Sequence, residues 1–265
     1  MHLNGRVLII AGSDSGGGAG IQADIKAVSA MGGYAATAIT AVTAQNTTGV
    51  QSVYPLPEDL IQQQISSVLD DIGADALKIG MLGTDTIIQA VSDSLGQKQG
   101  DIPLILDPVM VAKGGASLLR DDAVTAMKSL MLPKAFLITP NIPEAEILAA
   151  GSIKCRNDMV EAARAIQAQG PENVLLKGGH MDGDEMVDIL LLEDGTIKQF
   201  HTTRLETKHT HGTGCSMASA LSAKIAQGVD LPTAVAEVQT YIHAAIKNAP
   251  QLGAGHGPLN HFWAL

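Results

Sequence analysis

Short apolar runs alternate with amphipathic helical stretches along most of this chain, and few folds accommodate such a pattern. The run at 7–11 is rich in β-branched residues without polar alternation, which indicates a strand buried on both faces. Strands of this kind joined by helices form right-handed βαβ units around a parallel sheet. We therefore predict strands at 7–11, 34–42, 76–79, 104–106, 136–138 and 174–176, with helices after residue 20 and at 57–71, 85–97 and 231–248.

A hairpin departs from this alternation late in the chain. The runs at 186–192 and 197–203 flank Glu193-Asp194-Gly195-Thr196, in which Asp-Gly is a strong turn signal. We expect two antiparallel strands at one edge of an otherwise parallel sheet. Because no Pro- or Ser-rich linker interrupts the 265 residues, residues 1–265 are predicted to form a single domain.

Charge and composition exclude several classes of partner. The formal net charge of −10 disfavours a broad surface for nucleic acid or anionic membrane, and 3% aromatic residues are too few for extensive base stacking. Two cysteines, Cys155 and Cys215, make no disulfide framework, and the opening MHLNGRVLIIAG lacks the features of a cleavable signal. We therefore expect a cytoplasmic protein that binds neither nucleic acid nor membrane.

The stretch from Thr207 to Lys224 is the strongest candidate for a site of chemistry. Gly212 and Gly214 remove side chains from a turn that enters a small-residue helix, so backbone N–H groups can converge on a phosphate. Cys215 follows in the first turn, where the helix dipole is expected to lower its pKa and make it a base or nucleophile. The alternative is an ordinary helix entry with Cys215 as a small buried residue.

A second glycine-rich stretch, at 12–20, follows the first predicted strand. It is not a P-loop, because Gly20 is not followed by Lys and then Ser or Thr. Residues 18–23 match the dinucleotide fingerprint that ends in alanine, yet no acidic residue between Asp24 and Glu58 could bind the ribose. NAD is therefore not expected. Asp24 is either a carboxylate acceptor for another ligand or a solvated first-turn charge.

Polar side chains follow several predicted strands, at the edge of an α/β sheet where ligands bind. Gln45 offers a donor beside an acceptor, which matches an aminopyrimidine edge, but it is equally compatible with a turn residue. Later strands end in Asp107, in Asn141 with Glu144, and in Lys177. Two acids and a lysine together suit a metal ion, its water shell and phosphate oxygens.

The chain resembles the hydroxymethylpyrimidine and phosphomethylpyrimidine kinases of thiamine biosynthesis, a branch of the ribokinase-like superfamily. The resemblance covers nearly the whole chain and is carried by AGSDSGGGAGIQAD, TAQNTTGVQSV, KIGML, LDPVM, LITPNIPEA, LLKGGH and HGTGC. It implies an α/β fold, a three-layer αβα sandwich with a mostly parallel central sheet. It also implies no β lid, since the chain passes from Ala11 through the glycine loop into a helix. Cys215 stands where most superfamily members have an aspartate base, as is typical of the pyrimidine and pyridoxal branch.

The resemblance also implies residue roles and cofactors. It assigns catalysis to Cys215, Gly212, Thr213, Gly214 and Lys177. It assigns substrate binding to Gln45, Asp24, Gly12, Met81 and Val109. It assigns ATP binding to Asn141, Glu144, Lys177, Asp188 and Gly214, and metal binding through water to Asp107 and Glu144. ATP and Mg²⁺ are the implied cofactors, with room for a monovalent cation, and a homodimer is the implied assembly.

The implied reaction is ATP-dependent phosphorylation of 4-amino-5-hydroxymethyl-2-methylpyrimidine to its monophosphate and then to its diphosphate. Pyridoxal kinase, of the same branch, is the nearest alternative, and Gln45 favours the aminopyrimidine. Two readings come from other classes: an NAD-dependent oxidoreductase, and a non-catalytic ligand-binding module. The second would have no need to combine Lys177, Cys215 and the anion hole.

Overall fold

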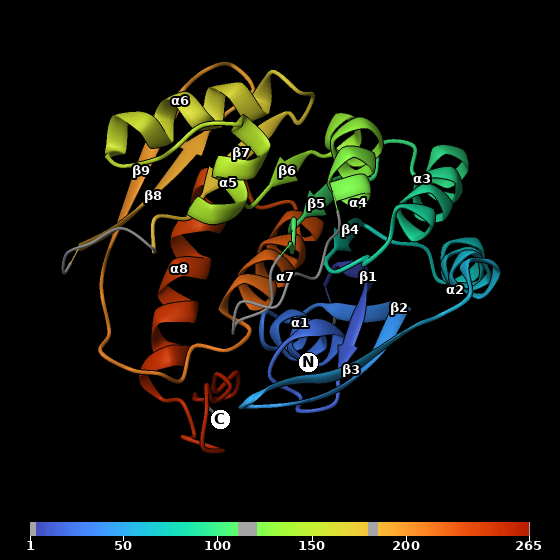
Figure 1. The fold of residues 1–265 in the computed structure, drawn as a ribbon, viewed down its shortest axis with the longest axis horizontal. Helices are drawn as coiled ribbons and strands as arrows, with labels where there is room; N and C mark the ends of the chain where they lie inside the picture. The colour runs from blue at the N-terminus through green and yellow to red at the C-terminus, as the bar shows by residue number, and fades with distance from the viewer. Residues whose placement is uncertain (1–3, 111–120, 180–184, 265) are drawn as a thin grey trace.

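A single sheet divides the molecule into two helical layers (Figure 1). The computed structural model describes residues 4–110, 121–179 and 185–264. The strands are β1 (Arg6–Asp14), β2 (Tyr34–Asn46), β3 (Gly49–Pro55), β4 (Ala76–Ile79), β5 (Leu104–Leu106), β6 (Leu137–Ile138), β7 (Asn173–Leu176), β8 (Glu185–Leu191) and β9 (Ile197–Thr203). Their order across the sheet is β3-β2-β1-β4-β5-β6-β7-β8-β9.

The central strands, from β2 to β7, run parallel, as the apolar runs predicted. The expected hairpin is confirmed, with β8 antiparallel to β7 and β9 antiparallel to β8. The chain also passes from β1 into the first helix through residues 15–19, all described, with no inserted strand. This architecture is the three-layer α/β sandwich expected from the sequence.

The opposite edge of the sheet differs from the expectation. The polar cluster after Val42, predicted to follow the strand, lies within β2, and β3 pairs antiparallel with it. The strand continues because its register with β1 extends to the pair Asp14 and Thr43, where the Thr43 hydroxyl donates to the Ser13 carbonyl at 2.9 Å. The chain therefore has antiparallel strands at both edges.

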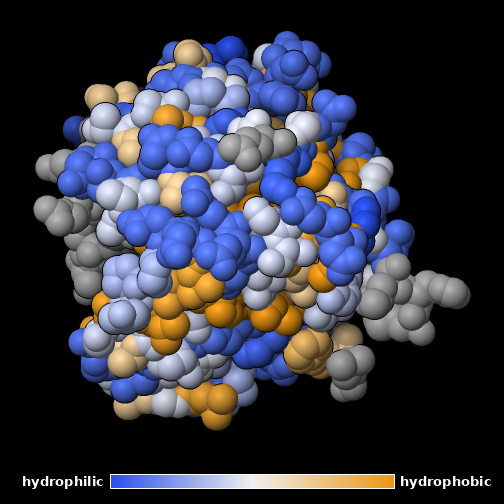
Figure 2. Space-filling model, turned by 90° about the vertical axis from the view of Figure 1, so that its right-hand side faces the viewer, coloured by the Kyte–Doolittle hydropathy of each residue, from blue (hydrophilic) through white to orange (hydrophobic). Residues whose placement is uncertain are grey.

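Apolar side chains remain exposed along this β2–β3 edge. Val42, Val53 and Tyr54 are 46%, 42% and 68% exposed, and they lie on β2 and β3. Figure 2, which looks at the right-hand side of Figure 1, shows apolar atoms gathered in its lower half between polar areas. Single exposed apolar residues are common, but Val42 and Tyr54 lie opposite each other on β2 and the edge strand β3, and such an exposed pair suits contact with another chain.

The helices form the two outer layers. They are α1 (Gly20–Ala30), α2 (Glu58–Asp71), α3 (Asp85–Lys98), α4 (Asp121–Ala126), α5 (Ile142–Ala149), α6 (Arg156–Gln167), α7 (Thr213–Ala226) and α8 (Leu231–Lys247). Figure 1 shows α1, α7 and α8 on one side of the sheet and α2 to α6 on the other. The sequence analysis did not predict α4, α5 or α6. Asn141 and Glu144 were predicted to follow the end of a strand. α5 begins between them, at Ile142, because Asn141 caps its first turn.

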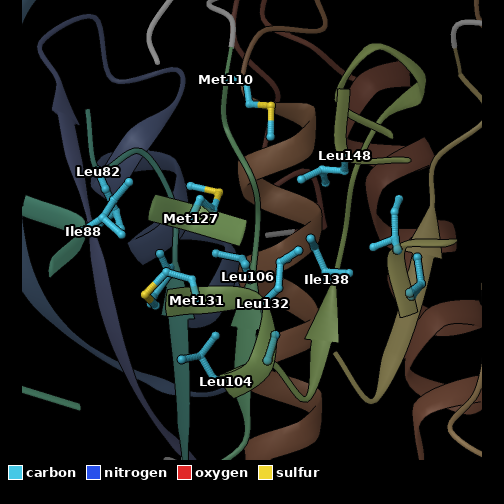
Figure 3. Close-up of a cluster of buried hydrophobic side chains, with 14 of the residues drawn as sticks. Leu82, Ile88, Leu104, Leu106, Met110, Met127, Met131, Leu132, Ile138 and Leu148 are labelled. Carbon is cyan, nitrogen blue, oxygen red and sulfur yellow. The ribbon is translucent and has the colours of Figure 1, made fainter. Parts of the chain in front are cut away.

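Alternating residues of the buried strands pack into two different cores. On β5, Leu104 and Leu106 join the cluster under α2 to α6, whereas Ile105 joins the cluster under α7 and α8. Figure 3 shows Leu104 and Leu106 pointing to the same side, together with Ile138 of β6 and the methionines Met127 and Met131. Both faces of the strand are buried, which explains its uninterrupted apolar sequence.

Among residues 4–110, 121–179 and 185–264, no helix combines the length and hydropathy needed to cross a membrane.

Candidate active site

A cavity of about 810 Å³ lies at the carboxyl ends of the parallel strands, the edge where α/β sheets bind ligands. The predicted site residues that line it come from nearly every strand end and from the start of α7. They are Gly12, Gln45, Met81, Asp107, Val109, Asn141, Glu144, Lys177, Asp188, Gly212, Thr213, Gly214 and Cys215. Asp24 is the one predicted site residue that is not at the cavity wall.

The turn into α7 requires glycine at position 212. Gly212 has a φ of 81°, and a Cβ added there would come within 1.8 Å of the Gly18 carbonyl oxygen. α7 then begins at Thr213, whose N–H donates to the Thr210 carbonyl at 3.3 Å, so the N–H groups of Gly214 and Cys215 are the donors that remain at this helix start. These donors, with the positive end of the helix dipole, form the predicted anion hole at the cavity wall.

Gly214 keeps this wall open. A Cβ at Gly214 would lie 3.3 Å from Lys177 Nζ and 3.8 Å from Asp107 Oδ2, so its absence leaves space between the helix start and both charges. Lys177 Nζ and Asp107 Oδ1 are 3.2 Å apart, and the Thr139 hydroxyl donates to the same oxygen at 3.2 Å. The three predicted elements of a phosphate site are therefore adjacent: a helix N-terminus, a lysine and a carboxylate.

Asn141 and Glu144 form a capping box at the start of α5. Glu144 Oε2 accepts from the Asn141 N–H at 2.8 Å, and Asn141 Oδ1 accepts from the Glu144 N–H at 3.0 Å. Burial raises the pKa of Glu144 to about 7; Lys177 opposes the shift and Asp107 adds to it. Glu144 thus faces both charges of the phosphate site and titrates close to neutrality.

The pKa of Cys215 is opposite to the prediction. Cys215 does lie in the first turn of α7, but burial raises the pKa of its thiol to about 12, and Asp107 and Asp24 add to the shift. Lys78 and a hydrogen bond from the Gly20 backbone favour the thiolate without reversing this. The helix dipole is outweighed because the thiol is surrounded mostly by protein and has carboxylates nearby, although Cys215 lines the cavity and is only partly buried. Cys215 is therefore a thiol in the resting protein.

Asp24 is also placed differently from both sequence expectations. It is neither solvated nor in contact with the cavity: its Oδ2 lies 2.9 Å from Lys78 Nζ, and neither side chain is exposed. The hydroxyl of Ser219 donates to its other oxygen at 2.7 Å. Lys78, rather than Asp24, reaches the cavity wall. Asp24 supports the wall from behind by holding Lys78.

Gln45 belongs to a cluster that the sequence did not reveal. In the structure its amide nitrogen lies 3.2 Å from His211 Nε2, and its amide oxygen lies 3.2 Å from Thr43 Oγ1. His211 Nε2 is also 3.0 Å from Asp14 Oδ2. Gln45, Thr43, Asp14 and His211 all line the cavity. The amide is therefore held from both sides while it faces the cavity.

Asp188 lies on β8 and lines the cavity. Its Oδ1 accepts from the Gly178 N–H at 2.8 Å, and its Oδ2 accepts from Gln239 Nε2 at 2.7 Å. Burial raises the pKa of Asp188, which these hydrogen bonds and Lys177 only partly offset. Asp188 therefore connects β7 to α8 in the structure, besides lining the pocket.

Three cavity residues, Lys78, Asp14 and His211, were not predicted as site residues. Lys78 had a signal in the sequence, because a lysine in the apolar run 76–79 of a doubly buried strand needs a buried partner. Asp14 and His211 lie inside the quoted segments AGSDSGGGAGIQAD and HGTGC, but their contact joins positions 197 residues apart. Local sequence carries no information on such a pair.

The donor set fits a metal–nucleotide complex better than a metal alone. No group of three or more His, Cys, Asp or Glu side chains in the described ranges is arranged to hold a metal ion. Asp107 and Glu144 supply two carboxylates beside Lys177, and Mg²⁺ is commonly held by one or two carboxylates together with phosphates and water. Because Gly214 has no side chain, there is open space between the start of α7 and the side chains of Lys177 and Asp107. The residues present therefore fit ATP with a divalent ion.

The sequence of this chain is similar to those of several known proteins. A family model described as phosphomethylpyrimidine kinase matches residues 14–260. The chain is 48% identical, over 98% of its length, to the hydroxymethylpyrimidine/phosphomethylpyrimidine kinase of Haemophilus influenzae, and covers 97% of that protein. It is 46% identical, over 98% of its length, to the thiamine biosynthesis bifunctional protein of Geobacter sulfurreducens, and spans 53% of that longer relative.

Comparison of structures gives the same fold. An ADP complex of Bacillus subtilis pyridoxal kinase matches with a TM-score of 0.90 and 36% identity, over 97% of each chain. A phosphomethylpyrimidine kinase from Clostridium difficile matches with a TM-score of 0.81 and 41% identity, over 91% of this chain and 99% of that one. Both neighbours are kinases of small ring compounds.

Proposed function

The chain belongs to the phosphomethylpyrimidine kinase family, and on that premise we propose that it phosphorylates 4-amino-5-hydroxymethyl-2-methylpyrimidine with ATP, first to the monophosphate and then to the diphosphate. The observation that carries the proposal is the shared cavity. The Gln45 amide, which suits an aminopyrimidine edge, lines the same 810 Å³ space as the N-terminus of α7 with Cys215 and Lys177. The products would serve thiamine biosynthesis, as in the relatives named above.

Phosphate binding is assigned to the helix start and its neighbours. When bound, ATP supplies the phosphoryl group and a divalent ion, proposed to be Mg²⁺, neutralises part of its charge. Lys177 and the first N–H groups of α7 bind the oxygens of the group being transferred. Asp107 and Glu144 hold the ion through water, and Asn141 orients Glu144 through the capping box. The burial of this site strengthens each of these interactions.

Cys215 is assigned to the acceptor hydroxyl. Phosphoryl transfer passes through a loose transition state in most analyses, so the hydroxyl proton needs to leave only late. The thiol orients the hydroxymethyl oxygen, and in the molecules where it is ionised it accepts the proton as the new O–P bond forms and ADP leaves. Because its pKa is raised to about 12, the thiolate is a minor species at pH 7 but a strong base.

The second phosphorylation uses the same cavity with a different acceptor. The acceptor oxygen then belongs to the phosphate of the first product and is already anionic. It has little need of a base, so Cys215 matters less in this step. Lys177 and the α7 N–H groups keep their roles, because the transferred group is the same.

Pyridoxal kinase is the second candidate, and a specific observation favours it. The B. subtilis pyridoxal kinase structure matches this chain with a TM-score of 0.90. The two functions share the scaffold and differ in the ring that the Gln45 side of the cavity receives.

A kinase assay tests the proposal directly. The purified protein is incubated with ATP and Mg²⁺ and, in parallel, with the hydroxymethylpyrimidine, its monophosphate and pyridoxal. We expect both pyrimidine substrates to be phosphorylated, with a higher kcat/KM than pyridoxal. Turnover of pyridoxal alone would make the B6 kinase the correct function. Replacing K⁺ by Na⁺ in the same assay tests the monovalent cation expected from the resemblance.

A cytoplasmic homodimer is proposed alongside this reaction. The cytoplasm supplies ATP, and the exposed apolar side chains of the β2–β3 edge are a described surface that suits contact with a second copy. Sedimentation equilibrium tests the assembly: twice the 27.4 kDa chain mass supports a dimer, and the single mass contradicts it.

A further inference from the structure

The cluster of Asp14, His211, Gln45 and Thr43 contains enough hydrogen-bond partners to determine the direction of the Gln45 amide. The oxygen and nitrogen of an amide have nearly the same shape, so only their partners distinguish them. As placed, the amide nitrogen faces His211 Nε2 and the amide oxygen faces Thr43 Oγ1, each at 3.2 Å. The partners on both sides favour the reverse orientation, with the two atoms exchanged.

Both carboxylate oxygens of Asp14 accept hydrogen bonds from backbone N–H groups. Its Oδ1 accepts from the Gly16 N–H at 2.8 Å, and its Oδ2 accepts from the N–H groups of Gly18 at 3.1 Å and Ala19 at 2.8 Å. Burial raises the pKa of Asp14, but the hydrogen bonds from His211, Gly16 and Ala19 outweigh burial and hold that pKa below its ordinary value. Asp14 is therefore ionised at neutral pH and has no proton to donate.

The His211 side follows from this. His211 Nε2 lies 3.0 Å from Asp14 Oδ2, and since a carboxylate only accepts, Nε2 must carry the hydrogen. A nitrogen that carries a hydrogen cannot accept one from an amide NH₂. The Gln45 atom that lies 3.2 Å from Nε2 must therefore be the amide oxygen, which shares the Nε2 hydrogen with Asp14.

The Thr43 side leads to the same assignment without using His211. A threonine hydroxyl has one hydrogen, and Thr43 donates it to the Ser13 backbone carbonyl, which only accepts, at 2.9 Å. Thr43 Oγ1 can then only accept from Gln45. The Gln45 atom that lies 3.2 Å from it must be the amide nitrogen.

We infer that His211, held by Asp14, is a positioning residue that fixes the Gln45 amide with its oxygen toward His211 and its nitrogen toward Thr43, and so sets the direction in which an aminopyrimidine docks. The docking part rests on the proposed function. Each terminal atom of the amide has a second hydrogen-bonding position: a lone pair on the oxygen and an N–H on the nitrogen. An aminopyrimidine edge presents an amino N–H beside a ring nitrogen. Its amino group therefore lies on the His211 side and its ring nitrogen on the Thr43 side.

The amide direction can be measured in the full-length wild-type protein without substrate. Nuclear Overhauser contacts from the Gln45 side-chain NH₂ protons to the Thr43 methyl group are expected, and ¹⁵N shifts of His211 should show a protonated Nε2. Contacts from those NH₂ protons to the His211 ring, or an unprotonated Nε2, would overturn the inference. This result is independent of activity, so a protein that turned over no aminopyrimidine would refute the proposed function alone.

The positioning role is measured with two variants that both lose the imidazole ring. His211→Gln keeps a donor that can reach Asp14 and Gln45, and His211→Leu has none. We expect His211→Leu to raise KM for the pyrimidine alcohol by roughly 5- to 100-fold, because a buried polar group then lacks its partner. The kcat and the KM for ATP should change by less than about threefold. His211→Gln should recover most of the loss. Equal impairment of both variants, or a wild-type KM in both, would overturn the positioning role.

Discussion

Lys78 and Asp24 form an ion pair of 2.9 Å in which neither side chain is exposed to solvent. They lie on β4 and α1, 54 residues apart, and the pair connects the sheet to the helical layer behind the cavity. Burial lowers the pKa of Lys78, but the negative charges of Asp24 and Asp107 help to outweigh burial and keep that pKa above its ordinary value. A permanent cation is thereby held at the cavity wall near Cys215.

Replacing Lys78 by Met should destabilise the protein strongly. Removal of one partner leaves Asp24 as a buried unpaired charge, which costs about 3–5 kcal/mol. For a chain of this size that lowers Tm by roughly 6–20 °C in a thermal scan.

Lys98→Met is the matched control, because Lys98 pairs with the largely exposed Asp70. This variant should lower the free energy of unfolding by less than about 1 kcal/mol. Adding Asp24→Asn to Lys78→Met should restore part of the loss. An unchanged Tm in Lys78→Met would mean that the pair contributes nothing to stability.

Cys215→Ala should impair the first phosphorylation while leaving the fold intact. General-base catalysis is typically worth 10²–10⁴-fold, so kcat on the alcohol should fall within about that range. Because the thiol pKa is raised to about 12, wild-type kcat should still be rising with pH at alkaline values, and the variant should lose this dependence. The exposed Cys155→Ala is the control. A folded Cys215→Ala enzyme with wild-type kcat would show that Cys215 only packs, and a wild-type plateau near pH 8 would show that its pKa is not raised.

Glu144 should make the free protein less stable as the pH rises. Its pKa is raised from 4.5 to about 7, so between these values the folded state binds more protons than the unfolded state. The free energy of unfolding then falls as the pH rises through this window. Glu144→Gln should reduce the difference in Tm between pH 5 and pH 8, and Glu161→Gln on the exposed face of α6 should not. The same pH difference in wild type and Glu144→Gln would contradict the raised pKa.

Gln45→Leu should weaken pyrimidine binding selectively. Loss of the amide leaves the donor and acceptor of the ring unpaired, at a cost of roughly 1–3 kcal/mol, so kcat/KM should fall by about one to two decades. The KM for ATP should hardly move, because the Gln45 side chain contacts Thr43 and His211 rather than Lys177, Asp107 or Glu144. Gln51→Leu, on the exposed strand β3, is the control. Wild-type pyrimidine kinetics in Gln45→Leu would show that Gln45 is only a residue of strand β2 with no role in substrate binding.

The two glycines at the start of α7 should respond differently to alanine. Gly214→Ala adds a methyl group 3.3 Å from Lys177 Nζ within a helix, so Tm should hold or rise while the KM for ATP increases. Gly212→Ala should lower Tm, because its φ of 81° disfavours a side chain and the Cβ would lie 1.8 Å from the Gly18 carbonyl oxygen. Thermal scans and ATP kinetics on both variants check this. Unchanged ATP kinetics in a folded Gly214→Ala variant would place the phosphates elsewhere.

The order of elements was largely predictable because the signals are local. The run at 7–11 lies within β1, and Asp194-Gly195 lies in the loop between β8 and β9, as hydrophobic pattern and turn chemistry predict. β3 was missed, and the extent of β2 was underestimated. Polar residues after Val42 resemble a strand end when read alone, whereas pairing with β1 and β3 keeps them extended.

The sequence alone indicated most of the predicted side chains that line the cavity, because the ends of parallel strands meet at one edge of a sheet. It did not indicate Lys78, Asp14 or His211, and it assigned Asp24 to the cavity, which Asp24 does not reach. The tertiary structure decided the charge states and directions of those side chains. Asp24 is buried against Lys78, Cys215 keeps its proton, and the Gln45 amide is oriented by His211 and Thr43. Desolvation and hydrogen-bond direction depend on neighbours that are brought together from distant positions in the chain, such as Gln45 and His211, 166 residues apart. A local sequence pattern contains neither quantity, so only the folded arrangement determines them.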